Sequence, residues 1–192
     1  MLDAEIIEYR KQILDYAKFL LKENEKMNLI GKSTVDSVWD RHIKDCLQIM
    51  KFIKNKDVKV ADLGSGAGLP GILLSICGVK EVHLFEKSPK KCNFLEKCKR
   101  FSTNKIIIRN VNLNDYSDNS FNIITSRALG SLNMLLDISK KLKKDDGALI
   151  FLKGKKVYDE ITEAKKKHKF EYVLHNSETS DEGKIVVIAR LE

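Results

Sequence analysis

The chain has 192 residues, of which 43% are hydrophobic, and a formal net charge of +8. This length and apolar content suit one compact domain with a full core, and they exclude a disordered chain or a small fold held by disulfides. The four cysteines show neither a CxxC pair nor metal-site spacing, so we expect buried, reduced thiols and no metal. With no signal-peptide pattern and no apolar stretch near the roughly 20 residues of a bilayer span, we expect a cytoplasmic monomer without a membrane partner.

The positive charge has two interpretations. It favours a polyanionic partner, because clustered Lys and Arg bind phosphates independently of sequence. It also fits a chain that is rich in lysine throughout, with 29 Lys against 6 Arg. Residues 87–109 carry eight basic groups against the single acid Glu96, either as a phosphate-binding surface or as a solvated helix face.

Two helices are expected at the start of the chain. Apolar residues recur at helical spacing over residues 6–20, and again over residues 35–50 after Ser33, a candidate N-cap with an acid three residues on. Trp39 belongs to the second apolar stripe and is expected to fill the core. Residues 1–56 are therefore predicted to form a helical extension of the single domain.

From residue 57 to 192 the pattern changes to short β-rich runs that alternate with helical ones. Strands are predicted at 58–63, 81–86, 105–111, 121–128 and 147–154, with helices at 70–77, 88–101 and 132–142. Such alternation predicts an α/β fold of βαβ units, a mostly parallel sheet with helices on both faces. Residues 169–176 and 183–191 read as two strands joined by a polar loop, so we expect an antiparallel hairpin at one sheet edge.

The stretch ADLGSGAGLPG, residues 61–71, holds four of the ten glycines and falls in the first strand-to-helix turn. Glycines there allow a tight bend and the close approach of a ligand to the backbone. Glu86 closes the second predicted strand, 22 residues after Gly64, where a carboxylate receives two ribose hydroxyls in such folds. Position and spacing together predict a nucleotide-like cofactor.

The kind of nucleotide is less directly indicated. Gly66, Gly68 and Gly71 satisfy the pattern GxGxxG and so permit NAD. Pro70 removes a backbone N–H that a pyrophosphate would need, which favours S-adenosylmethionine because that donor has no phosphate. Asp62 is then either a water-mediated partner of the donor's ammonium group or a buried acid bonded to local N–H groups.

Six segments follow one another in an order that is hard to obtain otherwise. They are MNLI at 27–30, DRHIKDCL at 40–47, DLGSGAGLPGI at 62–72, FNIITSRAL at 121–129, LKG at 152–154 and the closing IVVIAR. In this order the sequence resembles the bacterial ribosomal RNA methyltransferases called glucose-inhibited division protein B, or RsmG, which methylate guanine N7. The resemblance implies a class I methyltransferase sheet, Rossmann-like, with S-adenosylmethionine as the methyl donor. It also implies a partner, 16S ribosomal RNA or the small ribosomal subunit, modified in its decoding-region loop.

The resemblance implies cofactor contacts at Gly64 and Leu69 and a further contact at Arg127. The family's Ala-Glu or Val-Glu pair at the adenine pocket is replaced here by Val111 and Asn112, which removes a carboxylate charge, and Asn110 stands where Arg is usual. Together the cofactor candidates are Asp62, Gly64, Gly66, Gly68, Leu69, Glu86, Val111, Asn112 and Arg127.

The substrate candidates are Arg41, His42, Arg127 and Lys153. Arg127 follows the fourth strand at its carboxyl end, where it contacts cofactor or an RNA phosphate or forms a surface salt bridge. Lys153 follows the fifth strand and is either a similar contact or an ordinary strand-end lysine. Arg41 and His42 neighbour Asp45 on one helix, so they either form the mouth of the active site and contact RNA or make a surface pair.

Guanine N7 has an in-plane lone pair at neutral pH, so it attacks the sulfonium methyl by SN2 displacement without a general base. We therefore nominate no catalytic base and expect the rate to come from positioning and electrostatics. Two alternatives remain open from the residues: an NAD-dependent reductase, favoured by GxGxxG and Glu86, and a noncatalytic RNA-binding module.

Overall fold

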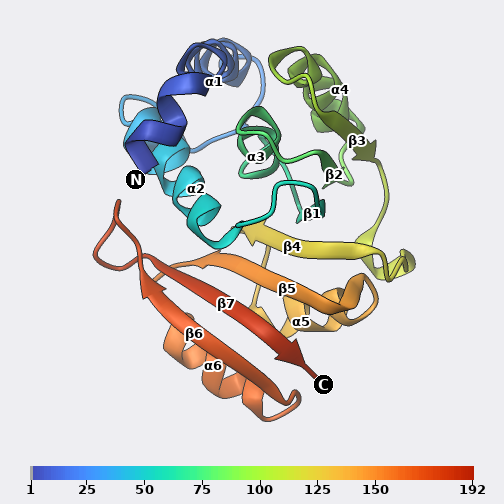
Figure 1. The fold of residues 1–192 in the computed structure, drawn as a ribbon. Helices are drawn as coiled ribbons and strands as arrows, with labels where there is room; N and C mark the ends of the chain where they lie inside the picture. Colours follow the sequence, from blue (N-terminus) through green and yellow to red (C-terminus); the bar gives the residue numbers. More distant parts are fainter. Residues whose placement is uncertain (1) are drawn as a thin grey trace.

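The computed structural model describes the backbone of residues 2–192 and the side chains of residues 7–192, so the predicted helical position Ile6 lies outside the described side chains. Its centre is a seven-stranded sheet with the order β3-β2-β1-β4-β5-β7-β6 (Figure 1). The strands are β1 (Lys59–Leu63), β2 (Glu81–Phe85), β3 (Lys105–Arg109), β4 (Phe121–Arg127), β5 (Lys143–Lys153), β6 (Phe170–Asn176) and β7 (Lys184–Leu191). β1 to β5 run parallel, whereas β7 pairs antiparallel with both β5 and β6. The expected mostly parallel sheet with a C-terminal antiparallel hairpin is confirmed.

Helices cover both faces of this sheet. The α-helices are α1 (Leu2–Asn24), α2 (Asp45–Leu47), α3 (Gly71–Ile76), α4 (Pro89–Cys98), α5 (Leu132–Lys140) and α6 (Val157–Lys165). α1 to α4 pack on one face, and α5 and α6 pack on the other (Figure 1). Side chains alternate along a strand, so β1 serves both layers: Val60 enters the first core, and Ala61 and Leu63 enter the second.

Local sequence explains where two of these helices begin. Ser88 caps α4 by accepting a hydrogen bond from Lys91 N, and Pro89 occupies the first turn, where its missing N–H has no partner to lose. Ser131 caps α5 in the same way through Met134 N. Each cap follows the carboxyl end of a parallel strand, so both helices start at that edge of the sheet.

The N-terminal extension packs directly on the glycine turn. Ile13 and Leu20 of α1 are fully buried, and the Tyr16 hydroxyl donates a hydrogen bond of 2.6 Å to the Ala67 carbonyl. Trp39 is partly buried against the same core, as its place in the apolar stripe predicts.

The second predicted helix is not one continuous α-helix. It is divided into the 3-10 turn η1 (Lys32–Thr34), the π-helix η2 (Trp39–Lys44), α2, and the 3-10 turn η3 (Gln48–Phe52). The expected N-cap is wrong, because Ser33 lies inside η1, and the capping position is Gly31. Short π-helical segments often occur at functional sites, since the extra residue per turn moves side chains off the regular helical face.

The structure adds one helix that we did not predict. α6 connects β5 to β6, and its buried residues Val157, Ile161 and Ala164 follow the spacing of an amphipathic helix. The remaining short elements are the 3-10 turns η4 (Lys99–Phe101) and η5 (Leu113–Asp115). All four cysteines are buried. Within residues 2–192, no helix is both long and apolar enough to cross a membrane, and no cluster of His, Cys, Asp and Glu side chains suits a metal ion.

Candidate active site

The glycine turn after β1 has a backbone that other residues adopt only with strain. Gly64 and Gly66 have φ angles of +68° and +53°. A Cβ atom on Gly64 would lie 2.4 Å from Leu129 Cδ1, whereas the nearest atom to a Cβ on Gly66 would be 3.7 Å away. Gly64 is therefore required by packing as well as conformation, and Gly66 leaves its backbone next to open space.

Glu86, the residue after β2, holds this turn in place. Its Oε2 accepts a hydrogen bond of 3.0 Å from Gly66 N, and its Oε1 accepts one of 2.8 Å from Ser88 N. The residue is 8% exposed. A carboxylate has about four acceptor sites, so Glu86 retains capacity for further donors while it joins the glycine turn to the start of α4.

A cavity of about 420 Å³ opens beside these residues, and we call it the glycine-turn cavity. Five of the nine predicted cofactor residues line it: Gly64, Gly66, Glu86, Val111 and Asn112. Phe85, Leu129 and Met134 supply apolar wall. The volume and the mixture of apolar wall with a few polar groups are those of a small-molecule site.

Asn112 also has a structural contact. Its Oδ1 accepts a hydrogen bond of 3.2 Å from Asn114 N and caps η5. The amide at this position can therefore order the loop after β3 without a carboxylate.

The other four predicted cofactor residues lie elsewhere. Leu69 is 3% exposed, within the core. A Cβ on Gly68 would lie 2.5 Å from Ile72 Cγ1, which fixes the close packing of the turn on α3. Asp62 is fully buried at the end of β1, and its Oδ2 accepts a hydrogen bond of 3.1 Å from Gly71 N. Its contacts are thus those of the buried strand-end acid, the second of the two interpretations.

Asp62 nevertheless has a free acceptor. Its Oδ1 has no hydrogen-bond partner in the described part of the chain. Burial raises the pKa of Asp62 to about 7, and the hydrogen bond from Gly71 N opposes that rise. An unsatisfied buried oxygen is costly, so the residues at the end of β1 fit a ligand that brings a donor, such as an ammonium group or a water bound to it.

A second cavity, of about 330 Å³, lies on the other side of the end of β4, and we call it the Arg127 cavity. All four predicted substrate residues line it: Arg41, His42, Arg127 and Lys153. Lys155 and Lys184 add to its positive charge, and Asp45 and Glu182 oppose it. The structure therefore brings together residues that are 112 positions apart in sequence.

Ala128 lines both cavities. Its φ angle is +60°, the left-handed region, and among the described non-glycine residues it alone has a positive φ. Such a conformation costs about 1–2 kcal/mol for a residue with a side chain, and strained residues cluster at functional sites. A side chain no larger than a methyl group thus stands where the two cavities adjoin.

Arg127 is the first member of a chain of hydrogen bonds that runs into the N-terminal extension. Its Nη2 donates to His42 Nδ1 over 2.8 Å, and its Nη1 donates to the Arg41 carbonyl over 3.2 Å. A guanidinium only donates, so Nδ1 of His42 is unprotonated and Nε2 carries the hydrogen. Nε2 then donates to Thr34 Oγ1 over 2.7 Å, and Thr34 Oγ1 donates to the Gly31 carbonyl over 2.8 Å.

The charge state of His42 agrees with this direction. Burial, followed by the positive charges of Arg127 and Arg41, lowers the pKa of His42 from 6.5 to about 4. The imidazole is therefore neutral at pH 7 and is held as one tautomer.

The loop between β6 and β7 forms the outer wall of the Arg127 cavity, a role that we did not predict. Thr179 Oγ1 donates to Asp45 Oδ1 over 3.0 Å. Gln48, only 2% exposed, accepts from Glu178 N and donates to Ser177 Oγ, each over 3.0 Å. No pattern in the sequence indicates this contact. What marks it is the burial of the Gln48 side chain, which only the structure shows.

Lys153 is largely occupied by neighbouring groups. Its Nζ donates to the Gly130 carbonyl over 2.7 Å and forms an ion pair of 2.5 Å with Glu160. Its side chain is 7% exposed. It therefore supports the turn that follows β4 and places positive charge behind the Arg127 cavity.

The strand order, the glycine turn and the adjoining cavities define a class I methyltransferase, whose methyl donor is S-adenosylmethionine. Solved structures share the fold. A ribosomal protein L11 methylase from Lactobacillus delbrueckii subsp. bulgaricus is 19% identical, with 78% of each chain covered and a TM-score of 0.62. M. jannaschii TYW2, crystallised with AdoMet, is 20% identical over 76% of this chain and 73% of that one, with a TM-score of 0.58.

Sequence comparison identifies the family. The profile of rRNA small subunit methyltransferase G matches residues 9–186. A relative of that name from Rickettsia felis is 41% identical over 176 residues, which are 92% of this chain and 91% of the relative. Another, from Rickettsia typhi, is 41% identical over 181 residues, 94% of each chain. The chain belongs to the rRNA small subunit methyltransferase G family, and the resemblance noted in its motifs is confirmed.

Proposed function

We propose that this protein transfers a methyl group from S-adenosylmethionine to N7 of a guanine in the decoding-region loop of 16S ribosomal RNA. The observation that carries the proposal is the contact between two unlike cavities at Ala128. One is partly apolar and has a carboxylate at its edge, which suits an adenosyl group. The other is rich in Arg and Lys, which suits the phosphates around a target base.

In this proposal the glycine-turn cavity holds the donor. Glu86 receives the ribose hydroxyls on its remaining acceptor sites, and Gly64 and Gly66 let the donor lie against the backbone. Val111 and Asn112 flank the adenine, with the amide of Asn112 in place of the family's usual carboxylate. Asp62 receives the donor's ammonium group, through water, on its unpaired Oδ1.

The chemistry asks for no general base. When bound, S-adenosylmethionine would supply a methyl on a sulfonium. The lone pair of guanine N7 would form the new N–C bond by SN2 displacement as the C–S bond breaks, leaving neutral S-adenosylhomocysteine and moving the positive charge to the purine. The protein then has to hold the acceptor base in line and keep water away. Arg127 is fixed by His42 for this task, Arg41 adds positive charge where RNA phosphates approach, and Lys153 supports the turn after β4 through Gly130 and Glu160.

The proposal is tested with labelled donor and three acceptors from cells that lack the protein: purified 16S RNA, small-subunit assembly intermediates and mature small subunits. The modified base is then mapped. Methylation at guanine N7 in the decoding-region loop supports the proposal, and the acceptor with the highest kcat/KM identifies the natural substrate. Methylation at another base would keep the chemistry and overturn the target. A melting temperature raised by NAD and not by S-adenosylmethionine would overturn the donor assignment.

A further inference from the structure

A third cavity, of about 630 Å³, lies where the chain leaves α1 and passes the start of α4. We call it the α4 groove. Leu21, Met27 and Val35 give it apolar surface, and all three also pack against the core. The groove is thus an open surface feature with a fixed floor.

The edges of the α4 groove are basic. Lys26, Lys32, Lys90 and Lys91 line it together with the single acid Glu25. Lys26 is paired with Glu23. Within the described side chains, no carboxylate forms an ion pair with any of the other three lysines.

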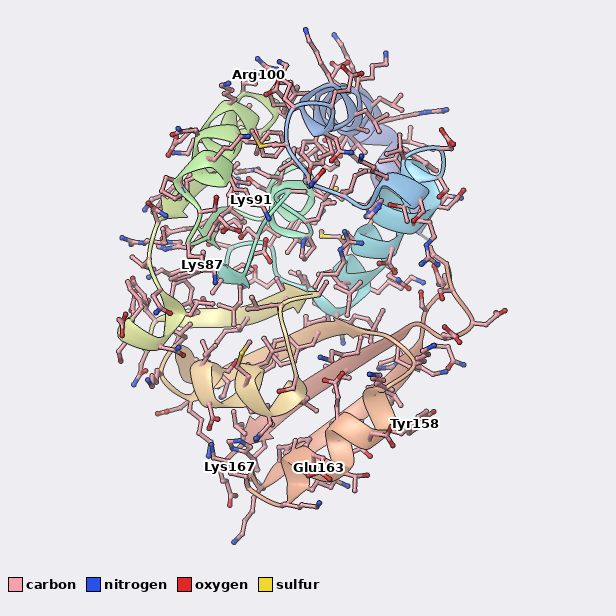
Figure 2. All side chains as sticks on the ribbon, turned by 180° about the vertical axis from the view of Figure 1, so that it is seen from behind. Lys87, Lys91, Arg100, Tyr158, Glu163 and Lys167 are labelled. Carbon is pink, nitrogen blue, oxygen red and sulfur yellow. The ribbon has the colours of Figure 1, made fainter. Side chains whose placement is uncertain are left out.

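These lysines connect the groove to the candidate active site. Lys91 lines both the α4 groove and the glycine-turn cavity. Figure 2 shows Lys87, Lys91 and Arg100 along one side of the molecule, from the end of β2 to the far end of α4. Two of the basic side chains in residues 87–109, Lys90 and Lys91, therefore share a surface with Lys26 and Lys32, which are distant in sequence.

Hydrogen bonds within the protein hold the walls of the groove in place. Asn24 Oδ1 accepts hydrogen bonds of 2.9 and 3.0 Å from Leu29 N and Ile30 N, which closes the loop after α1. Lys90 Nζ donates to the Lys26 carbonyl over 3.4 Å, across the groove from α4 to that loop. A preformed site binds with less loss of conformational entropy than a flexible one.

We propose that the α4 groove binds the backbone of a single-stranded RNA segment next to the target guanine, with phosphates along the edge formed by Lys32, Lys90 and Lys91. This inference rests on the proposed function, because it takes the RNA substrate as given and assigns it a second contact surface. A polyanion is the fitting occupant, since three ammonium groups lack a carboxylate partner and the surface leads directly to the donor cavity. The apolar floor accommodates sugars or bases between those phosphates.

The test replaces two exposed groove lysines with an uncharged side chain of similar helix propensity, Lys32→Gln with Lys90→Gln. The matched control is Lys144→Gln with Lys169→Gln, two exposed lysines outside the groove, one at the start of β5 and one immediately before β6. The probe is an unmodified transcript of 16S RNA. Its affinity for each protein is measured between 50 and 300 mM KCl by fluorescence anisotropy, with donor affinity measured by calorimetry.

Each phosphate contact on single-stranded nucleic acid contributes about 0.7 to the slope of log K against log salt. The groove variant should therefore lose about 1.4 from the magnitude of the slope and bind about 25-fold more weakly at 0.1 M salt. Its donor affinity and melting temperature should equal those of the wild type, and the control should keep the wild-type slope.

A groove variant with the wild-type slope would overturn the inference while leaving the proposed function intact. So would a variant that binds the transcript normally but fails to bind small subunits, because the groove would then contact a ribosomal protein. If the wild type binds donor but neither binds nor methylates any small-subunit RNA, the proposed function and this inference both fail.

Discussion

Protonation of His42 is expected to break the hydrogen bond that holds Arg127 in the wall of the Arg127 cavity. Nδ1 of His42 accepts from Arg127 Nη2, so a proton on that nitrogen would replace an acceptor with a second positive charge at a distance of 2.8 Å. Arg41 adds a third positive charge nearby, and burial removes the water that would otherwise solvate the imidazolium. Acid should therefore destabilise this part of the protein.

The size of the effect follows from the pKa of His42 in the two states. In the unfolded chain the pKa is near its ordinary 6.5, and in the folded protein it is about 4. Between these values the unfolded state binds the proton and the folded state does not, so the free energy of unfolding decreases as pH falls. The contribution is complete above pH 6.5 and is lost progressively towards pH 4. At pH 5 the loss amounts to about 2 kcal/mol.

Urea unfolding at pH 7.5 and pH 5.0 measures this loss against the variant His42→Asn, whose side-chain oxygen can accept from Arg127 and does not titrate. Burial also lowers the pKa of His83 and His168, but both residues are present in the two proteins and their effects cancel. The wild type should lose about 2 kcal/mol more than His42→Asn between the two pH values. Equal losses would refute the neutral, hydrogen-bonded imidazole.

Substitutions at three further positions, Glu86, Gly64 and Ala128, probe the walls of the cavities, with Gly31→Ala as a control outside them. Glu86→Gln leaves one oxygen where the carboxylate had two. Because hydrogen bonds to charged groups contribute about 1.5–3 kcal/mol, the Kd for S-adenosylmethionine measured by calorimetry should rise about 10- to 100-fold. An unchanged Kd would remove Glu86 from the donor site. Gly64→Ala places a methyl 2.4 Å from Leu129 Cδ1 at a φ of +68°, so it should lower the free energy of unfolding by about 2 kcal/mol and weaken donor binding. The control Gly31→Ala should do neither, because the nearest atom to its Cβ would be 3.6 Å away. Ala128→Gly relieves the strain of the left-handed backbone conformation and should retain methyl transfer. Ala128→Val crowds the boundary of the two cavities and should lower kcat/KM at least tenfold. Equal activity of the two variants would contradict the place of Ala128 at that boundary.

The sheet and the glycine turn were predictable because their signals are local. A strand such as β1 is marked by its own β-branched and apolar residues, and a turn with φ values of +68° and +53° is marked by glycine itself. The same reasoning found Glu86, since a residue at the carboxyl end of β2 must lie next to the end of β1 in a parallel sheet. α6 carries an equally local signal, the apolar residues Val157 and Ile161 at helical spacing, although we did not predict this helix.

The irregular helix over residues 39–52 could not be predicted in this way, because distant contacts decide its shape. Asp45 accepts from Thr179, 134 residues later, and Gln48 binds the backbone of Glu178, 130 residues later. Apolar spacing alone favours a regular helix there, which would turn these polar groups to other directions. The glycine pattern likewise marks the turn but does not say which of its residues pack towards α3, as Gly68 does, and which line the cavity.

The two cavities differ in which parts of the chain build them. The lining of the glycine-turn cavity comes entirely from residues 64–138, within the α/β core. The Arg127 cavity needs the extension as well, which contributes Arg41, His42 and Asp45 to its wall. Asp45 takes hydrogen bonds from Arg127 and from Thr179 on its two oxygens, so one carboxylate joins the end of β4, the extension and the β6–β7 loop. In the proposed function, donor binding therefore belongs to the common methyltransferase core, and acceptor choice belongs to the place where the extension and the hairpin loop meet that core.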